Sequence, residues 1–177
     1  MPMATVLILP FVFKRSQDLD EVTKKIQSNL SMPCKLSHLH FNHHYAFDTV
    51  RDQYHSTRLL KGLETQIEQK ENKILGITHL DLFIPILTYV FGEAHLNGPA
   101  AVASDYRLNP QFYGLPPNPE LVKERLIKEC IHELGHTLGL RHCPNPQCVM
   151  RTSTYVEEID LKLDTLCSRC RKMADIS

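Results

Sequence analysis

The segment from Asn118 to His142, "NPELVKERLIKECIHELGHTLGLRH", is the most informative part of the sequence, because a predicted helix and a predicted metal site coincide in it. Asn118 is a favourable N-cap and Pro119 suits the first helical position. After them, apolar residues recur at helical spacing: Leu126, Ile127, Cys130, Ile131, Leu134 and Leu138. The pattern predicts one long helix with a buried face.

Two histidines share one face of this helix. His132 and His136 are four residues apart, so their imidazoles lie one turn apart and can bind one ion at about 2.0–2.1 Å. Glu133 lies about 100° further round the helix, where it can reach a water on that ion without ligating it. This is the H-E-x-x-H arrangement of two metal ligands and a general base.

A third histidine follows after a predicted bend. Gly139 can adopt the left-handed conformation that ends a helix, so the chain can turn and bring His142 to the same ion. Three protein ligands leave a fourth position open for water, which is typical of catalytic zinc. The alternative is that His132 and His136 are ordinary polar residues of an amphipathic helix. That alternative does not account for Glu133, Gly139 and His142 at their required offsets.

Four cysteines follow the histidines. Cys143 and Cys148 are separated by 18 residues from Cys167-x-x-Cys170. Cysteines presented in pairs by two short loops predict a closed tetrahedral site for a structural zinc. The chain would then bind two Zn²⁺ ions, one catalytic and one structural. Two alternatives stay open: a redox dithiol at Cys167 and Cys170, or two disulfides in an oxidising compartment.

The rest of the chain alternates between predicted strands and helices, which favours the α/β class, with helices packed on a mixed twisted sheet. Little apolar sequence follows Pro144, so the tail needs a metal to hold its shape. We therefore predict a catalytic subdomain over residues 1–142 and a small zinc-stabilised subdomain over residues 143–177. The predicted elements are a strand at 5–10, helix 18–30, a strand from 34, helix 48–71 and strand segments between 74 and 108.

Composition excludes several classes of function. Twenty Lys and Arg residues balance twenty Asp and Glu residues, so bulk charge favours neither nucleic acid nor a membrane surface as a partner. The apolar start "MPMATVLILPF" lacks preceding positive charge and a cleavage site, so it predicts a strand and not a signal peptide. No window approaches the roughly 18 apolar residues of a membrane helix. We expect a cytoplasmic monomer.

The combined motif resembles the archaemetzincin family of metzincin-type zinc peptidases. The resemblance rests on "HELGHTLGLRHC", Cys148-Val149-Met150 and Cys167-x-x-Cys170, and covers roughly Ile74 to Cys170. It implies a zincin-like fold, Glu133 as general base and Met150 as the floor of the metal site. It also implies a catalytic zinc on His132, His136 and His142 and a structural zinc on Cys143, Cys148, Cys167 and Cys170. From chemistry alone, Met150 would be a core residue.

The resemblance also implies that a peptide substrate lies extended along a sheet edge. The candidate is "AAVASDYRL", residues 100–108, whose small side chains would let a peptide backbone approach. The alternative is an ordinary edge strand guarded by Pro99. Some metzincins have a tyrosine two residues after the floor methionine, where this chain has Thr152, so the oxyanion stabiliser besides zinc is unassigned.

These residues support two hypotheses about function. The first is a zinc-dependent metallopeptidase that hydrolyses peptide bonds through a zinc-activated water with Glu133 as general base. The second is a zinc-stabilised protein-binding module with an idle or occluded peptidase-like site. The presence of Glu133 favours the first.

Overall fold

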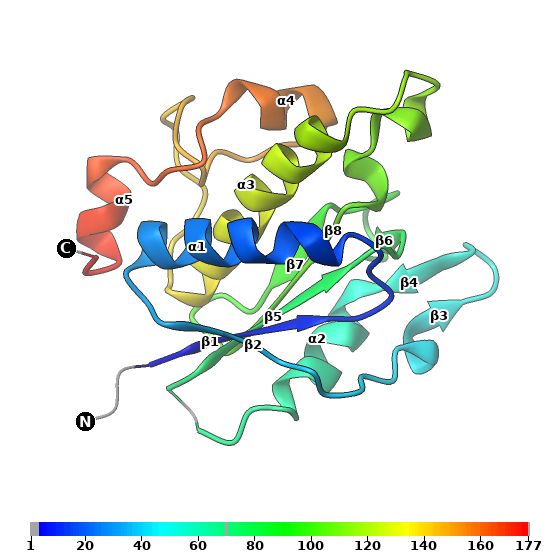
Figure 1. Ribbon diagram of the computed structural model, residues 1–177, viewed down its shortest axis with the longest axis horizontal. Helices are drawn as coiled ribbons and strands as arrows, with labels where there is room; N and C mark the ends of the chain where they lie inside the picture. The colour runs from blue at the N-terminus through cyan, green and yellow to red at the C-terminus, as the bar shows by residue number, and fades with distance from the viewer. Residues whose placement is uncertain (1–3, 70, 177) are drawn as a thin grey trace.

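The computed structural model describes residues 4–69 and 71–176, so Met1 to Met3, Lys70 and Ser177 lie outside the described part (Figure 1). The strands are β1 Val6–Pro10, β2 Cys34–Leu36, β3 Phe47–Asp48, β4 Gln53–His55, β5 Lys73–Thr78, β6 Leu82–Phe83, β7 Gly92–Ala94 and β8 Ala100–Ser104. The α-helices are α1 Leu19–Leu30, α2 Ser56–Glu64, α3 Pro119–Thr137, α4 Val156–Leu161 and α5 Ser168–Met173.

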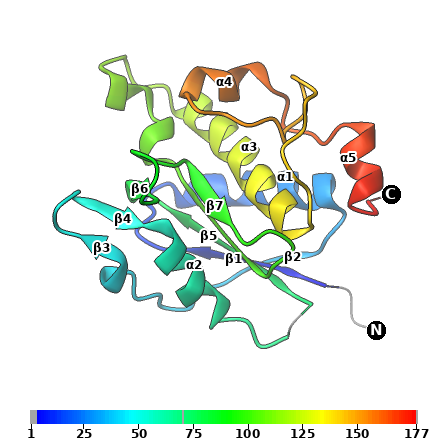
Figure 2. The ribbon, with the colours of Figure 1, turned by 180° about the vertical axis from the view of Figure 1, so that it is seen from behind.

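The main sheet has five strands in the order β2-β1-β5-β8-β7. The first four are parallel, and β7 runs antiparallel to β8 at one edge. Helices α1 and α3 cover one face and α2 covers the other, as the two opposite views show (Figures 1 and 2). This arrangement confirms the predicted mixed sheet with packed helices.

Alternating side chains of β8 join the cores on the two faces of the sheet. Ala101 and Ala103 belong to the hydrophobic cluster that also contains the apolar residues of α1 and α3. Ala100 and Val102 belong to the cluster beneath α2. All four are fully buried, and the two that face α3 are both alanines, so α3 can lie close to the sheet. The small residues of β8 therefore determine how near the metal-site helix comes to the strands.

The helix predicted over residues 48–71 is wrong at both ends, because α2 ends at Glu64 and residues 48–55 are not helical. That stretch forms β3 and β4, and helix α2 begins only at Ser56. The Asp48 carboxylate accepts hydrogen bonds from the backbone N–H groups of Val50 and Arg51, and Asp52 has a left-handed φ of 55°. The left-handed φ at Asp52 favours a turn over a helix, because an interior helical residue needs a right-handed conformation.

The predicted substrate edge at residues 100–108 is also wrong. Strand β8 pairs with β5 on one side and with β7 on the other, so it lies inside the sheet. The reason is the turn before it: Asn97 has a left-handed φ of 54° and the chain folds back, placing β7 antiparallel beside β8. The edge strand on this side of the sheet is therefore β7.

The tail packs against the helical face of the sheet, with α4 beside α3 and α5 near the C-terminal end of α1 (Figure 2). Its buried residues Val149, Met150, Ile159 and Leu166 belong to the same hydrophobic cluster as the face of the sheet under α3. The hydrophobic core is thus continuous across position 142, and the proposed division between subdomains at that position stays a prediction.

Within residues 4–69 and 71–176, no helix combines the length and the apolar character that crossing a bilayer would require.

Candidate metal centres

Helix α3 brings the first two histidines together. The Asn118 side chain caps the helix by accepting the N–H of Leu121 at 3.1 Å, and the helix then runs unbroken to Thr137. The Nε2 atoms of His132 and His136 lie 3.1 Å apart. Two nitrogens bound to one tetrahedral zinc at about 2.0–2.1 Å would be about 3.3 Å apart. The pair therefore has the spacing that a shared zinc ion needs.

Backbone carbonyls orient both rings. The Nδ1 atom of His132 lies 2.8 Å from the Val149 carbonyl, and Nδ1 of His136 lies 2.7 Å from the Leu140 carbonyl. A carbonyl can only accept, so each Nδ1 carries the proton and each Nε2 keeps its lone pair for a metal. The surrounding chain thus selects the tautomer that ligation requires.

The bend at Gly139 is confirmed, with a φ of +86°. It carries His142 to the other two histidines, with ring centroids 5.3 Å from His132 and 5.1 Å from His136. One ligand atom from each of the three rings lies within 4.8 Å of the others. The three side chains fit one zinc ion.

Burial lowers the pKa of all three histidines, and most strongly that of His132, which is only 5% exposed. The positive charge of Lys162 lowers these pKa values further, whereas the Glu129 carboxylate raises those of His136 and His142. The rings are therefore neutral near pH 7, which is the form that binds zinc.

We expect acid to destabilise the protein when no metal is bound at the histidines. A histidine binds a proton near pH 6.5 when unfolded and resists it when folded, so stability is lost as the pH falls below about 6.5. The loss for His132 is up to about 1.4 kcal/mol per pH unit. Urea denaturation at a series of pH values measures it. In the His132→Gln variant, the slope of the unfolding free energy against pH should fall by the equivalent of about one proton. An unchanged slope would show that protonation of His132 does not cause the loss of stability.

Glu133 is 6% exposed and lies on the side of α3 that faces β7. Burial raises the pKa of its carboxyl well above the usual range, and the nearby Glu129 carboxylate raises it further. A Cβ atom added to Gly92 would lie only 2.7 Å from Cγ and 2.9 Å from Oε1 of Glu133. The missing side chain at Gly92 therefore makes room for the carboxylate. Sequence reasoning missed Gly92, because nothing along the chain links it to the helix.

Gly92→Ala should displace Glu133. The added methyl would also lie 2.6 Å from the Val102 carbonyl oxygen, so the strand cannot absorb the clash without moving. A displacement of about 1 Å at a reacting group costs up to about 10²-fold in rate, and we expect a loss of that order in any hydrolytic activity, with zinc content unchanged. Gly76→Ala is the control, since it crowds only Leu63 and Phe11 side chains in the core. Equal losses in both variants would contradict a specific role for Gly92.

A cleft of about 500 Å³ opens over these residues. The segment from Leu87 to Ala94, which includes edge strand β7, forms one wall, and the segment from Thr152 to Tyr155 forms another. The cleft is also lined by Glu129, His132, Glu133, His136 and His142. The candidate metal site is thus accessible from the edge of the sheet.

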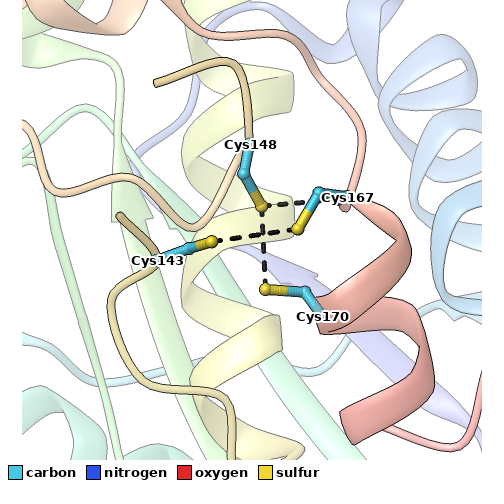
Figure 3. Close-up of side chains that lie close together, drawn as sticks. All are labelled: Cys143, Cys148, Cys167 and Cys170. Carbon is cyan, nitrogen blue, oxygen red and sulfur yellow. Dashed lines mark hydrogen bonds between the residues drawn. The ribbon is translucent and has the colours of Figure 1, made fainter. Parts of the chain in front are cut away.

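The four cysteines of the tail converge on one point (Figure 3). The Sγ atoms of Cys143 and Cys167 are 3.8 Å apart, as are those of Cys148 and Cys170. Sulfurs bound to one tetrahedral zinc at about 2.3 Å would also be about 3.8 Å apart. All four thiols are free of disulfides. The donor set and spacing fit a closed zinc site, which is the structural type.

Met150 and Cys143 connect the two centres. Met150 is fully buried, and its Sδ lies against α3 at Gly135, between the two helical histidines in sequence. The N–H of Cys143 donates to the Met150 carbonyl at 2.9 Å. The residue proposed as the floor of one metal site is thus hydrogen-bonded to a cysteine of the other.

A helix that carries two histidines one turn apart and a buried glutamate, followed by a glycine bend, a third histidine and a methionine underneath, is typical of a zincin-type protein. The model of peptidase family M54 matches residues 12–175. Archaemetzincin from Methanocaldococcus jannaschii is 47% identical over 128 residues, which are 72% of this chain and 69% of that protein. Archaemetzincin from Pyrococcus horikoshii is 44% identical over 129 residues, 72% of this chain and 68% of that protein. The chain therefore belongs to peptidase family M54, the archaemetzincins.

Solved structures agree over nearly the whole chain. A zinc-dependent peptidase from Methanocorpusculum labreanum superposes with a TM-score of 0.85 at 28% identity, covering 96% of this chain and 99% of that one. Archaemetzincin from Methanopyrus kandleri superposes with a TM-score of 0.80 at 34% identity, covering 98% and 94%. The fold is that of the archaemetzincins.

Proposed function

We propose that this metallopeptidase-family protein hydrolyses peptide bonds with a catalytic zinc held by His132, His136 and His142 and with Glu133 as general base. One observation carries the proposal: the three histidines and Glu133 line the same cleft, next to an edge strand. A zinc peptidase needs imidazoles whose orientation is fixed, so that they can bind the metal, and a carboxylate beside them that can accept a proton. Backbone carbonyls orient the imidazoles here, and Glu133 is the carboxylate.

The roles follow from the chemistry of each group. A bound zinc ion would supply Lewis acidity for the scissile carbonyl and for the attacking water. Glu133 takes the proton of that water and delivers it to the leaving amine. The raised pKa of Glu133 supports the first half of this task, since a carboxylate whose pKa is higher is a stronger base towards that water.

A peptide substrate would lie extended along β7. Among the described residues this strand pairs only with β8, so its outer edge can form a ladder with an added strand. That edge borders the cleft directly beside Glu133. Alternate side chains of the peptide would point into the cleft and towards the segment from Thr152 to Tyr155.

The second zinc would be structural. Cys143, Cys148, Cys167 and Cys170 complete a tetrahedron and leave no open position for a substrate. The total of two zinc ions per chain, the monomeric state and the cytoplasmic location stay predictions.

Metal analysis combined with a peptide-library digest tests the proposal. We expect two zinc ions per chain and cleavage of library peptides, with the double variant His132→Ala/His136→Ala retaining one zinc and cleaving nothing. A parent protein that holds two zinc ions yet leaves the whole library intact would favour the alternative, a zinc-stabilised binding module with an idle site. A parent protein without zinc at the histidines would refute the proposal.

A further inference from the structure

A buried ion pair joins the tail to the metal-site helix. The side chain of Lys162, in the segment after α4, is completely buried. Its Nζ donates to Oε1 of Glu129 on α3 at 3.0 Å and to the Arg151 carbonyl at 3.2 Å. The peptidase chemistry proposed above gives neither charged group a role.

Glu129 places this pair next to the candidate catalytic metal. It precedes His132 by three residues and Glu133 by four on the same helix, so its Cβ lies about 5–6 Å from theirs. It is 4% exposed and lines the cleft together with the three histidines. Without Lys162, a second buried carboxylate would stand beside Glu133.

Fold stability alone does not account for the pair. Burying two charges costs about as much as their attraction returns, and well-packed apolar residues in their place are often equally stabilising. The helix is already joined to the tail by a second ion pair, in which Arg125 contacts Asp160 at 2.7 Å through two hydrogen bonds. That pair lies one helical turn further from the histidines.

The effect of each charge on a cation at the histidines has a definite sign. An ammonium left alone beside the cleft repels the cation, whereas a carboxylate left alone attracts it. Both effects are strong in a buried site, because little water screens them. Together the two charges cancel, so the pair adds no net charge near the metal. The three histidine ligands are neutral as well, so the full positive charge of the metal can act on a substrate.

We propose that Lys162 and Glu129 form a positioning pair for the catalytic metal, in which each cancels the charge of the other beside the three-histidine site. The inference rests on the proposed function in one respect, that zinc binds these histidines. Neither residue touches the metal or the substrate in this role. The pair acts on the metal only through the electrostatic potential that it produces at the histidines.

Zinc affinity in a charge cycle tests the pair. The proteins are the parent, Glu129→Gln, Lys162→Met and the double variant, with affinity at the histidines measured by chelator competition after the four-cysteine site is loaded. The His132→Ala/His136→Ala protein binds zinc only at the four cysteines. Its titration is therefore subtracted from those of the other proteins. We expect Glu129→Gln to bind zinc about 10- to 100-fold more weakly. Lys162→Met should bind no more weakly than the parent, and the double variant should return close to the parent.

Two further variants separate charge from structure. Asp160→Asn breaks the Arg125 pair between the same two segments, so it should lower the unfolding midpoint and leave zinc affinity unchanged. Glu129→Asp keeps the charge and should retain much more affinity than Glu129→Gln, a comparison that holds even if Lys162→Met fails to fold.

Three results would overturn the inference. Equal affinity in all variants would show that the pair does not act on the metal. Weaker binding in both single variants and weaker still in the double variant would show a packing role. A Glu129→Asp protein as weak as Glu129→Gln would show that charge is not the cause. A parent that binds zinc at the histidines but cleaves no peptide would refute the proposed activity alone.

Discussion

Glu133→Gln is expected to reduce peptide hydrolysis by about 10²–10⁴-fold, because glutamine keeps the size of glutamate but cannot accept the proton of the attacking water. Glu133 is buried against Gly92 and does not belong to either group of candidate metal ligands, so both zinc ions should remain bound. The rate constant kcat should carry most of the loss and KM little, since the carboxylate acts in the chemical step. Steady-state kinetics and metal analysis on the same preparation measure both.

Glu120→Gln is the matched control for this variant. It makes the same chemical change on the same helix, in the exposed first turn and remote from the cleft lining. Its activity should equal that of the parent. If Glu133→Gln retained zinc and cleaved peptides at the parent rate, the general-base assignment would be wrong.

Cys143→Ser is expected to have the largest effect on stability. Structural zinc sites in small peptides bind with apparent free energies of about 10–16 kcal/mol, and the loss of one thiolate removes a large share of that. The tail carries two short helices of six residues each, so a metal at the cysteine cluster would add to the apolar packing that holds its shape. The zinc content should fall from two ions to one, and the thermal unfolding midpoint should fall with it.

The same change should also weaken zinc binding at the histidines, although Cys143 does not reach them. His142 is its neighbour in the chain, and the Cys143 N–H holds the Met150 carbonyl at 2.9 Å. Once Cys143 is released, the position of His142 is less restricted. Cys34→Ser, a thiol outside the cluster, is the control and should change neither property. Unchanged affinity at the histidines in Cys143→Ser would refute the coupling between the centres.

The metal-site helix could be predicted in detail because its determinants are local. The cap at Asn118, the spacing of His132 and His136 and the bend at Gly139 all depend on residues within a few positions of one another. Helical periodicity is a short-range property, so a linear pattern specifies which side chains share a face. The cysteine cluster was predictable for a related reason, since donor type and paired spacing restrict the possible chemistry.

The errors arose where the outcome depends on which strand pairs with which. Strand β8 has the small apolar residues that suit an edge as well as an interior position, and only its pairing with both β5 and β7 decides between them. The turn after Asp48 was missed because a charged, amphipathic stretch matched helical periodicity, whereas the backbone is left-handed at Asp52 and the flanking residues pair as β3 and β4.

Residue types and short spacings specify the two donor sets, the helix that carries one of them and the family, because metal chemistry and helical periodicity are local properties of the chain. Long-range packing, in contrast, places β7 beside the cleft, makes room for Glu133 at Gly92 and brings Lys162 into an ion pair with Glu129. Those contacts join residues 33 or more positions apart, as from Glu129 to Lys162, and packing in the folded chain alone brings them together.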